Sequence, residues 1–120
     1  MSETRIFEAA KDSVLSVLAF ARLQGFVVID GATYITKDGW VSGRILTMDS
    51  VGGEAGKRRK RELEAEGWRI QKRQIKGSRK FEYRLDMTLN SARRVAYNYN
   101  GKITPDMIYN NESPQVGIFD

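Results

Sequence analysis

The 120-residue chain contains no cysteine and no histidine, and it has only two prolines. Without cysteine it can form no disulfide framework and no thiolate metal site. Without either residue, a Ser-His-Asp triad, a cysteine nucleophile and an ordinary zinc site are all excluded. Glu62 and Glu66 share a helix face, but they lack the further Asp, Glu and Lys of a Mg²⁺ nuclease site and more simply pair with Lys or Arg one turn away. We therefore expect no catalytic residue, no metal and no cofactor, and we do not expect an enzyme.

A nucleotide-binding loop is also missing. The segment from Gly52 to Lys57 (GGEAGK) resembles one at first sight. A P-loop, however, needs four residues between its glycines and a Ser or Thr after the lysine. Here three residues separate Gly52 from Gly56, and Arg58 follows the lysine, so this segment is excluded as a phosphate loop.

Long apolar runs are absent as well. The longest apolar region, from Val14 to Ile29, is interrupted by Arg22, Gln24 and Gly25 and is too short to span a bilayer. The first residues carry Glu3 and Glu8 beside Arg5, whereas a secretory signal begins with a positive segment. We therefore expect no membrane partner and a cytoplasmic location.

Positive charge is concentrated in one part of the chain. The net charge is +5, but residues 57–86 contain twelve Lys/Arg and five Asp/Glu, a balance of +7. Residues 1–56 have a balance of −2, and residues 87–120 are neutral. A charge run alone is usually a solvated face. A local excess that coincides with a recognisable structural pattern instead favours binding to nucleic acid.

Residues 54–66 are predicted to form a basic helix, because they contain strong helix formers between Gly52-Gly53 and a stop at Gly67. Viewed down the helix, a narrow face that can lie close to a core holds Gly56, Lys60, Leu63 and Gly67. The opposite face collects Glu54, Lys57, Arg58, Arg61 and Ala65. The cations lie at the N-terminal end of the helix, where the helix dipole prefers anions. An external polyanion would relieve this conflict.

Residues 68–86 are predicted to form a second basic element, which we call the basic hairpin. Apolar and charged residues alternate from Trp68 to Gln71 and again from Lys80 to Asp86, as in two half-buried strands. The segment from Lys76 to Arg79 is the expected turn. Cations surround this turn at Lys72, Arg73, Lys76, Arg79 and Lys80.

The basic helix and the basic hairpin together resemble the helix-turn-helix and wing of small winged-helix proteins of bacteria and phages. The residues that match are Arg58, Arg59, Arg61, Glu62, Leu63, Gly67, Ile70, Tyr83 and Leu85. Lys60 departs from the pattern, which usually has an aliphatic residue at this position. The resemblance covers about residues 40–86. It implies a winged helix-turn-helix for this region. Together with the flanking patterns described below, we expect an α+β fold: a winged helix-turn-helix with an N-terminal helix, an extra β-hairpin and a C-terminal extension.

This resemblance implies double-stranded DNA as the partner. Lys57, Arg58 and Arg61 are expected to contact base edges and phosphates in the major groove, where Arg pairs with guanine. Arg59 and Lys60, which flank the core face, are expected to touch the DNA backbone. Contacts to phosphates or the minor groove are expected from Arg73, Lys76, Arg79 and Lys80. Duplex DNA is preferred to RNA because Phe81 and Tyr83 are used in the core and form no stacking platform.

Upstream, a first helix is expected from a cap at Ser2 to about Leu23, with Gly25 ending it. Its apolar circumference allows two interpretations: burial in the core, or a homodimer interface. A hairpin around Asp30-Gly31 follows, then a turn at residues 37–39. A short helix capped by Ser42 is expected to run to about Asp49 as the first helix of the helix-turn-helix.

Downstream of Asp86, a helix capped by Asn90-Ser91 and another beginning at Thr104-Pro105 are expected. The stretch from Asn110 to Pro114 is expected to be flexible. We divide the chain into a winged helix-turn-helix domain at residues 1–99, with its core at 40–86, and a partly flexible C-terminal extension at residues 100–120.

The last residues, Gln115-Val-Gly-Ile-Phe119, resemble the peptide that binds the bacterial sliding clamp. The resemblance implies that Gln115 reaches the rim of a hydrophobic cleft and that Ile118 and Phe119 fill its pockets. Alternatively, Ile118 and Phe119 fold back onto the domain. Two functions therefore remain open: a DNA-binding transcriptional regulator of phage or bacterial type, or a small interaction protein that binds a host protein such as the clamp.

Overall fold

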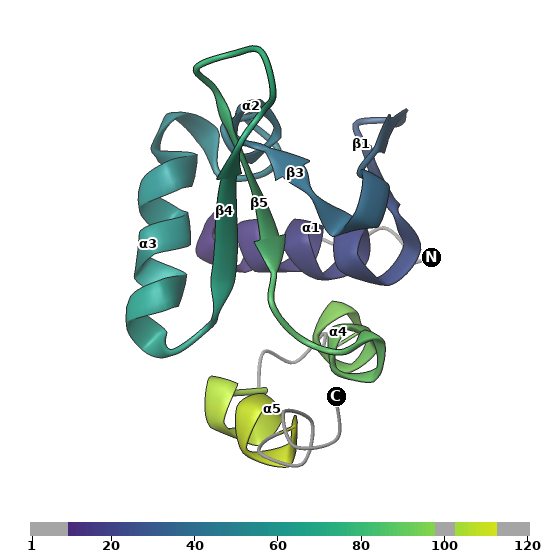
Figure 1. Ribbon diagram of the computed structural model, residues 1–120, viewed down its shortest axis with the longest axis vertical. Coiled ribbons are helices and arrows are strands. Elements are labelled where there is room, and N and C mark those ends of the chain that lie inside the picture. Colours follow the sequence, from purple (N-terminus) through teal and green to yellow (C-terminus); the bar gives the residue numbers. More distant parts are fainter. Residues whose placement is uncertain (1–9, 98–102, 113–120) are drawn as a thin grey trace.

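The computed structural model describes residues 10–97 and 103–112, which form a mixed arrangement of helices and two small antiparallel sheets (Figure 1). This confirms the α+β class. Within these ranges, no helix is both long enough and apolar enough to cross a membrane. In chain order the elements are α1 (Ala10–Gln24), β1 (Phe26–Ile29), β2 (Ala32–Ile35), η1 (Lys37–Gly39), β3 (Val41–Ser42), α2 (Gly43–Leu46), η2 (Gly53–Ala55), α3 (Gly56–Glu66), β4 (Ile70–Gln74), β5 (Phe81–Leu85), α4 (Leu89–Ala96) and α5 (Pro105–Glu112).

Helix α1 lies at the centre of the molecule, in contact with α3, α4, β1 and β5. From Val14 to Leu23 all of its apolar side chains are buried or half-buried, so burial within the chain accounts for its apolar circumference. Gly25, with a φ of 81°, ends the helix as predicted. Self-association through this helix stays a prediction, and the expected cap at Ser2 lies outside the described residues.

The expected hairpin after α1 is confirmed as β1 and β2. Asp30 and Gly31 have φ values of 52° and 84°, the left-handed conformations that a two-residue turn requires. Val27 and Ile29 point from β1 into the core. The hydroxyl of Ser50 donates to the Asp30 carboxylate at 2.7 Å, which ties this hairpin to the turn that precedes α3.

Helix α2 begins at the predicted cap, where the Ser42 hydroxyl accepts a hydrogen bond from the Ile45 N–H at 3.3 Å. It ends at Leu46, about one turn before the predicted end at Asp49. The Gly52 N–H donates to the Leu46 carbonyl at 3.0 Å, which turns the chain back early.

The turn between α2 and α3 is so close-packed that it requires glycine. A Cβ atom on Gly56 would lie 2.0 Å from the carbonyl oxygen of Leu46, and one on Gly52 would lie 2.6 Å from the Cα of Gly56. Any side chain at these positions would therefore collide with backbone. This close approach sets the position of α3 against α2.

Helix α3 buries three of the four residues of the predicted narrow face, Gly56, Lys60 and Leu63, whereas Gly67 at its end is exposed. It stops at Gly67, whose φ of 117° confirms the expected glycine end. Its α-helical part begins at Gly56 and not at Glu54, because a short 3₁₀ turn, η2, precedes it.

The basic hairpin is confirmed as β4 and β5, which pair from Ile70↔Leu85 to Gln74↔Phe81. The first strand begins at Ile70, two residues after the predicted start at Trp68. Together with β3 these strands form a sheet in the order β3-β5-β4. The inner face carries the buried Tyr83 and Leu85, and the outer face carries the residues that alternate with them, including Arg73, Glu82 and Arg84.

Two predictions for the C-terminal part are wrong. Helix α4 is capped by Thr88 and not by Asn90-Ser91, since the Thr88 hydroxyl accepts from the Ser91 N–H at 3.1 Å. Helix α5 begins at Pro105 as expected but runs through Glu112, so residues 110–112 belong to a helix and not to a flexible stretch.

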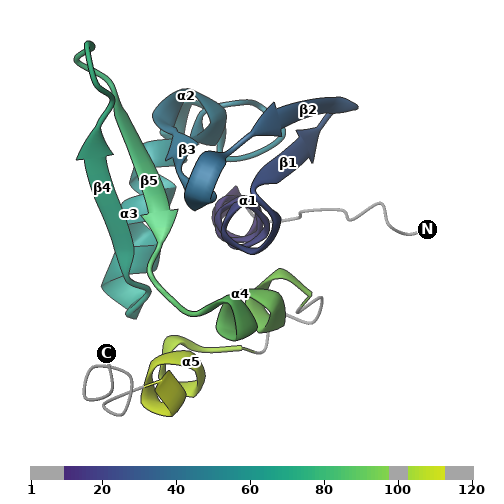
Figure 2. The ribbon, with the colours of Figure 1, turned by 45° about the vertical axis from the view of Figure 1, so that its right-hand side comes forward.

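Helix α5 lies beside α4 below the centre of the molecule (Figure 2). It packs against the start of the basic hairpin, where the Arg69 N–H donates to the Tyr109 hydroxyl at 2.9 Å. The expected boundary between residues 99 and 100 lies in a segment outside the described residues and stays a prediction. The tail residues Gln115, Ile118 and Phe119 also lie outside them, so the clamp-binding hypothesis stays a prediction.

Candidate nucleic-acid interface

The outer face of α3 carries the three cations expected to read DNA. Lys57, Arg58 and Arg61 are all exposed, opposite the buried Gly56, Lys60 and Leu63. The face is positioned by the glycine-dependent turn before it and by Leu63, which anchors the helix in the core. It therefore offers guanidinium and ammonium groups on a rigid element.

Lys57 extends from α3 across the beginning of α2. A Cβ atom on Gly43 would lie 2.9 Å from the Lys57 Cε, so the lysine stem lies directly over this glycine. Gly43 itself is buried at the start of α2. The absence of a side chain at position 43 thus leaves the space through which Lys57 reaches toward the basic hairpin.

A cleft of about 350 Å³ lies where α2, α3 and the basic hairpin meet. Ile75 and Phe81 form its apolar part, and hydroxyl groups come from Ser42 and Thr47. Its charged residues, in the part of the chain that the structure describes, are all cations, one from each of the three elements: Arg44, Lys57 and Lys80. Such a concave, cationic surface attracts a polyanion.

The sequence predicted Lys57 and Lys80 but missed Arg44 and Thr47 as members of this site. The sequence did contain a local signal for Arg44, which is a cation next to the apolar Ile45 and Leu46 of a short helix. In the structure Arg44 is exposed, whereas Ile45 and Leu46 face inward. Its proximity to Lys80, far along the chain, depends on the tertiary fold and has no counterpart in the sequence pattern.

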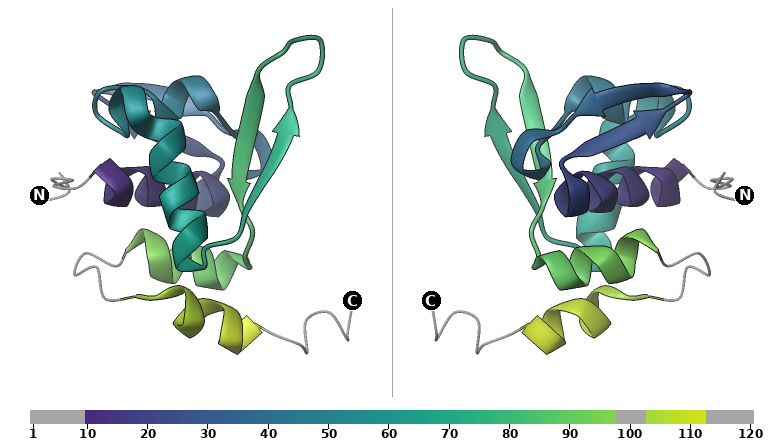
Figure 3. Two further views of the ribbon diagram at one scale, coloured as in Figure 1. Left: turned by 90° about the vertical axis from the view of Figure 1, so that its left-hand side faces the viewer. Right: turned by 90° about the vertical axis from the view of Figure 1, so that its right-hand side faces the viewer.

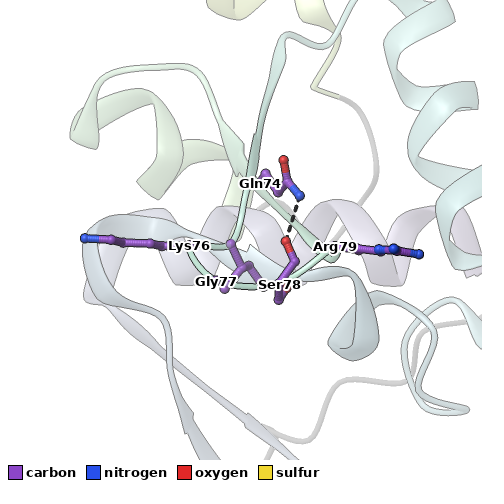
Figure 4. Close-up of a pocket in the computed structure, with 6 residues that line it drawn as sticks. Gln74, Lys76, Gly77, Ser78 and Arg79 are labelled. Atoms are coloured by element: carbon purple, nitrogen blue, oxygen red, sulfur yellow. Dashed lines mark hydrogen bonds between the residues drawn. The ribbon is translucent and has the colours of Figure 1, made fainter.

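The loop of the basic hairpin has a defined shape. Gln74 Nε2 donates to the Ser78 carbonyl at 2.7 Å, and the Lys80 N–H donates to the Ser78 hydroxyl at 2.8 Å. Lys76 and Arg79 project from opposite sides of this loop (Figure 4). The loop curves around an open hollow of about 530 Å³ lined by residues 74–79. The two cations can therefore contact anionic groups on both sides of a ligand that meets the tip of the loop.

Lys60 and Arg59 are placed differently from the other cations. Lys60 is only 7% exposed, with its Nζ 2.9 Å from Glu64 Oε1 and 5.0 Å from the centre of the Tyr83 ring. Arg59 donates to both carboxylate oxygens of Glu62, at 2.7 and 2.9 Å. Lys60 is therefore turned into the domain and away from the outer face of α3, and Arg59 is already held by an ion pair.

Tyr83 lies beneath Lys60 on the inner face of the sheet. Burial raises the pKa of its phenol, and the nearby Glu64 carboxylate raises that pKa further. The tyrosine is thus a neutral core residue, as expected, whereas Phe81 on the same strand is only partly buried and also lines the cleft.

Arg73 lies on the outer face of the sheet and also has partners within the chain. Its Nε is 2.5 Å from Glu82 Oε2, and its guanidinium carbon lies 4.0 Å from the centre of the Trp40 ring. The structure thus gathers Lys57, Lys80 and the unpredicted Arg44 at one cleft, leaves Arg58 and Arg61 exposed on the same helix as Lys57, and holds Arg73 in a separate cluster.

Comparisons with protein-family models, curated proteins and solved structures find no match for this chain. Across residues 10–97 and 103–112, no group of three or more acidic side chains is arranged to hold a metal ion.

Proposed function

We propose that this protein binds double-stranded DNA as a winged helix-turn-helix protein. In this proposal α2 and α3 form the helix-turn-helix, and the basic hairpin is the wing. The order of elements from β3 to β5 and the strand order β3-β5-β4 support this assignment, as does the glycine-dependent turn between α2 and α3.

The observation that carries the proposal is the convergence of Arg44, Lys57 and Lys80 on one cleft. Three cations from three elements at one concave surface raise the local positive potential, which attracts an anionic ligand. A DNA backbone that passes between α3 and the wing would place phosphates at this cleft.

In the proposed complex, α3 lies in the major groove. Lys57, Arg58 and Arg61 contact base edges and phosphates, and Arg58 and Arg61 supply most of any sequence preference. Lys76, Arg79 and Lys80 contact phosphates or the minor groove. Arg59 contributes at the flank, whereas the buried Lys60 takes no direct part.

We infer from the resemblance to small winged-helix proteins that the biological role is transcription regulation in a bacterium or a phage, in the cytoplasm. The test begins one step earlier, with DNA binding itself. Fluorescence anisotropy of a labelled random duplex is measured across a salt series for the wild type, and six phosphate contacts predict a log–log slope of about −5.

Two double variants make this test specific. Arg58→Ala/Arg61→Ala removes two cations from α3 and is expected to weaken binding by at least about tenfold. Arg93→Ala/Arg94→Ala removes the same charge from exposed positions on α4 and is expected to bind like the wild type. Absence of binding at low salt, or equal losses in both variants, would overturn the proposal.

A further inference from the structure

Trp40 stands at the centre of a cluster on the outer face of the β3-β5-β4 sheet. It directly precedes β3, and two guanidinium groups lie within cation–π distance of its ring. The guanidinium carbon of Arg73, from β4, is 4.0 Å from the ring centre, and that of Arg84, from β5, is 4.8 Å away. One indole ring thus connects the edge strand β3 to both strands of the wing.

Each arginine of this cluster is also held by other groups. Arg73 forms an ion pair with Glu82 on the neighbouring strand at 2.5 Å. Arg84 Nε donates to Gln71 Oε1 at 2.7 Å, and its Nη1 donates to the Asp38 carbonyl at 3.3 Å. Because planar guanidinium groups held at several points have little freedom, the ring and the strands are fixed relative to one another.

The wing needs such an attachment because its loop stands clear of the helices (Figure 3). Only two residue pairs, Val41↔Tyr83 and Ser42↔Glu82, join β3 to β5. On the inner face the wing is anchored by Tyr83 and Leu85. On the outer face the Trp40 cluster lies next to the last residue pairs of β4 and β5 before the loop, where Arg73 is paired with Glu82.

We propose that Trp40 is a positioning residue that sets the angle of the wing relative to α3. This inference rests on the proposed function and deepens it. The Trp40 cluster fixes the paired strands of the wing just before the loop, so that Lys80 reaches the cleft with Lys57 and Arg44, and Lys76 and Arg79 reach the DNA. Arg73 then acts through Trp40 and does not touch DNA, which reassigns one of the contacts that the sequence predicted.

The first experiment compares the salt dependence of duplex binding in Trp40→Leu and in a wing variant, Lys76→Gln/Arg79→Gln/Lys80→Gln. Each phosphate contact contributes about 0.9 to the magnitude of the log–log slope. The wing variant lacks three such contacts, so the magnitude of its slope should fall by about 2.7. Trp40→Leu should lose most of the same amount, and it should cause no further loss when combined with the wing variant. Trp40→Phe, which keeps an aromatic face, should keep most of the wild-type slope.

A merely structural effect of Trp40 would reduce the fraction of active protein and leave the slope of that fraction unchanged. Stoichiometric titration and denaturant unfolding of each variant separate these effects. The matched control is Arg69→Met, which removes a cation–π contact of 4.3 Å with Tyr109 at the far end of β4. It should leave the slope unchanged.

The second experiment tests whether Arg73 acts through Trp40. Arg73→Gln is made in the wild type and in Trp40→Leu. If Arg73 acts through Trp40, Arg73→Gln should lose slope in the wild type and should cause no further loss in Trp40→Leu. A further loss of about 0.9 in Trp40→Leu would assign Arg73 to a phosphate and overturn the inference.

The outcomes separate the two proposals. A wild-type protein that does not bind DNA overturns both. A wild type that binds with a wing-dependent slope, together with a Trp40→Leu variant that keeps this slope or adds to the loss of the wing variant, overturns only the positioning role.

Discussion

Thr36 is fully buried, and its hydroxyl has no hydrogen-bond partner among the described residues. Thr36→Val removes this desolvated hydroxyl and keeps the shape, so the free energy of unfolding should stay equal or rise by about 1 kcal/mol. The same substitution at Thr88 removes the cap of α4 and should lower the free energy of unfolding by about 1 kcal/mol. Urea unfolding of both variants gives the two signs, and a loss at Thr36 as large as at Thr88 would contradict the assignment.

Lys60 lies on the predicted core face of α3, but its ammonium group is also turned into the domain and not toward a DNA backbone. Its ammonium group is buried against Glu64 and Tyr83. Since burying the lysine ammonium costs desolvation, and Glu64 stays exposed to water when its partner is removed, Lys60→Met should unfold at the same free energy as the wild type or up to about 1 kcal/mol higher. Its affinity for DNA should not change.

The control for this prediction is Lys57→Met, the same substitution on the exposed face of α3, which should weaken DNA binding. Chemical unfolding and anisotropy check the two quantities. A Lys60→Met variant that loses as much affinity as Lys57→Met would show that Lys60 leaves the core to meet the DNA.

At the scale of elements, the placement of α3 depends on Gly56. Its φ of −54° suits any residue, so alanine there would gain about 1 kcal/mol of helix propensity. The Cβ atom would, however, lie 2.0 Å from the Leu46 carbonyl oxygen, and moving backbone atoms out of this contact costs free energy. Gly56→Ala should therefore lower the free energy of unfolding by about 3 kcal/mol, as overpacking does.

Gly53→Ala is the matched control for Gly56→Ala. Gly53 has a φ of 67°, but an added Cβ atom would meet nothing within 4 Å. Only the left-handed conformation is then penalised, by about 1 kcal/mol. Thermal or urea unfolding ranks the two variants, and the reverse order would show that the turn adapts to a side chain at position 56.

At the scale of the whole molecule, the cleft should bind DNA as a unit built from distant residues. Arg44→Gln should reduce the log–log salt slope by about 0.9, as expected for one phosphate contact, although Arg44 lies outside the basic stretch. Lys37→Gln removes the same charge from an exposed position in η1 and should bind like the wild type. Equal binding by all three proteins would remove Arg44 from the interface.

The sequence predicted most of the local structure of this chain. The ends of α1 and α3 at Gly25 and Gly67, the turn at Asp30-Gly31 and the cap at Ser42 all agree with the structure. Each depends on the conformational preference of one or two residues and can therefore be predicted without knowledge of the fold. The errors, such as the cap of α4 and the length of α5, occurred where several polar residues compete or where packing extends a helix.

The sequence by itself determined where the positive charge lies and which segments are helix and hairpin, because those properties are set within a few neighbouring residues. Only the tertiary structure decided which cations lie together. It buried the Lys60 ammonium group against Tyr83, held Arg73 against Trp40, and brought Arg44 to Lys57 and Lys80. These contacts join residues on different turns and strands, and their geometry follows from the packing of α1, α3 and the sheet around one core.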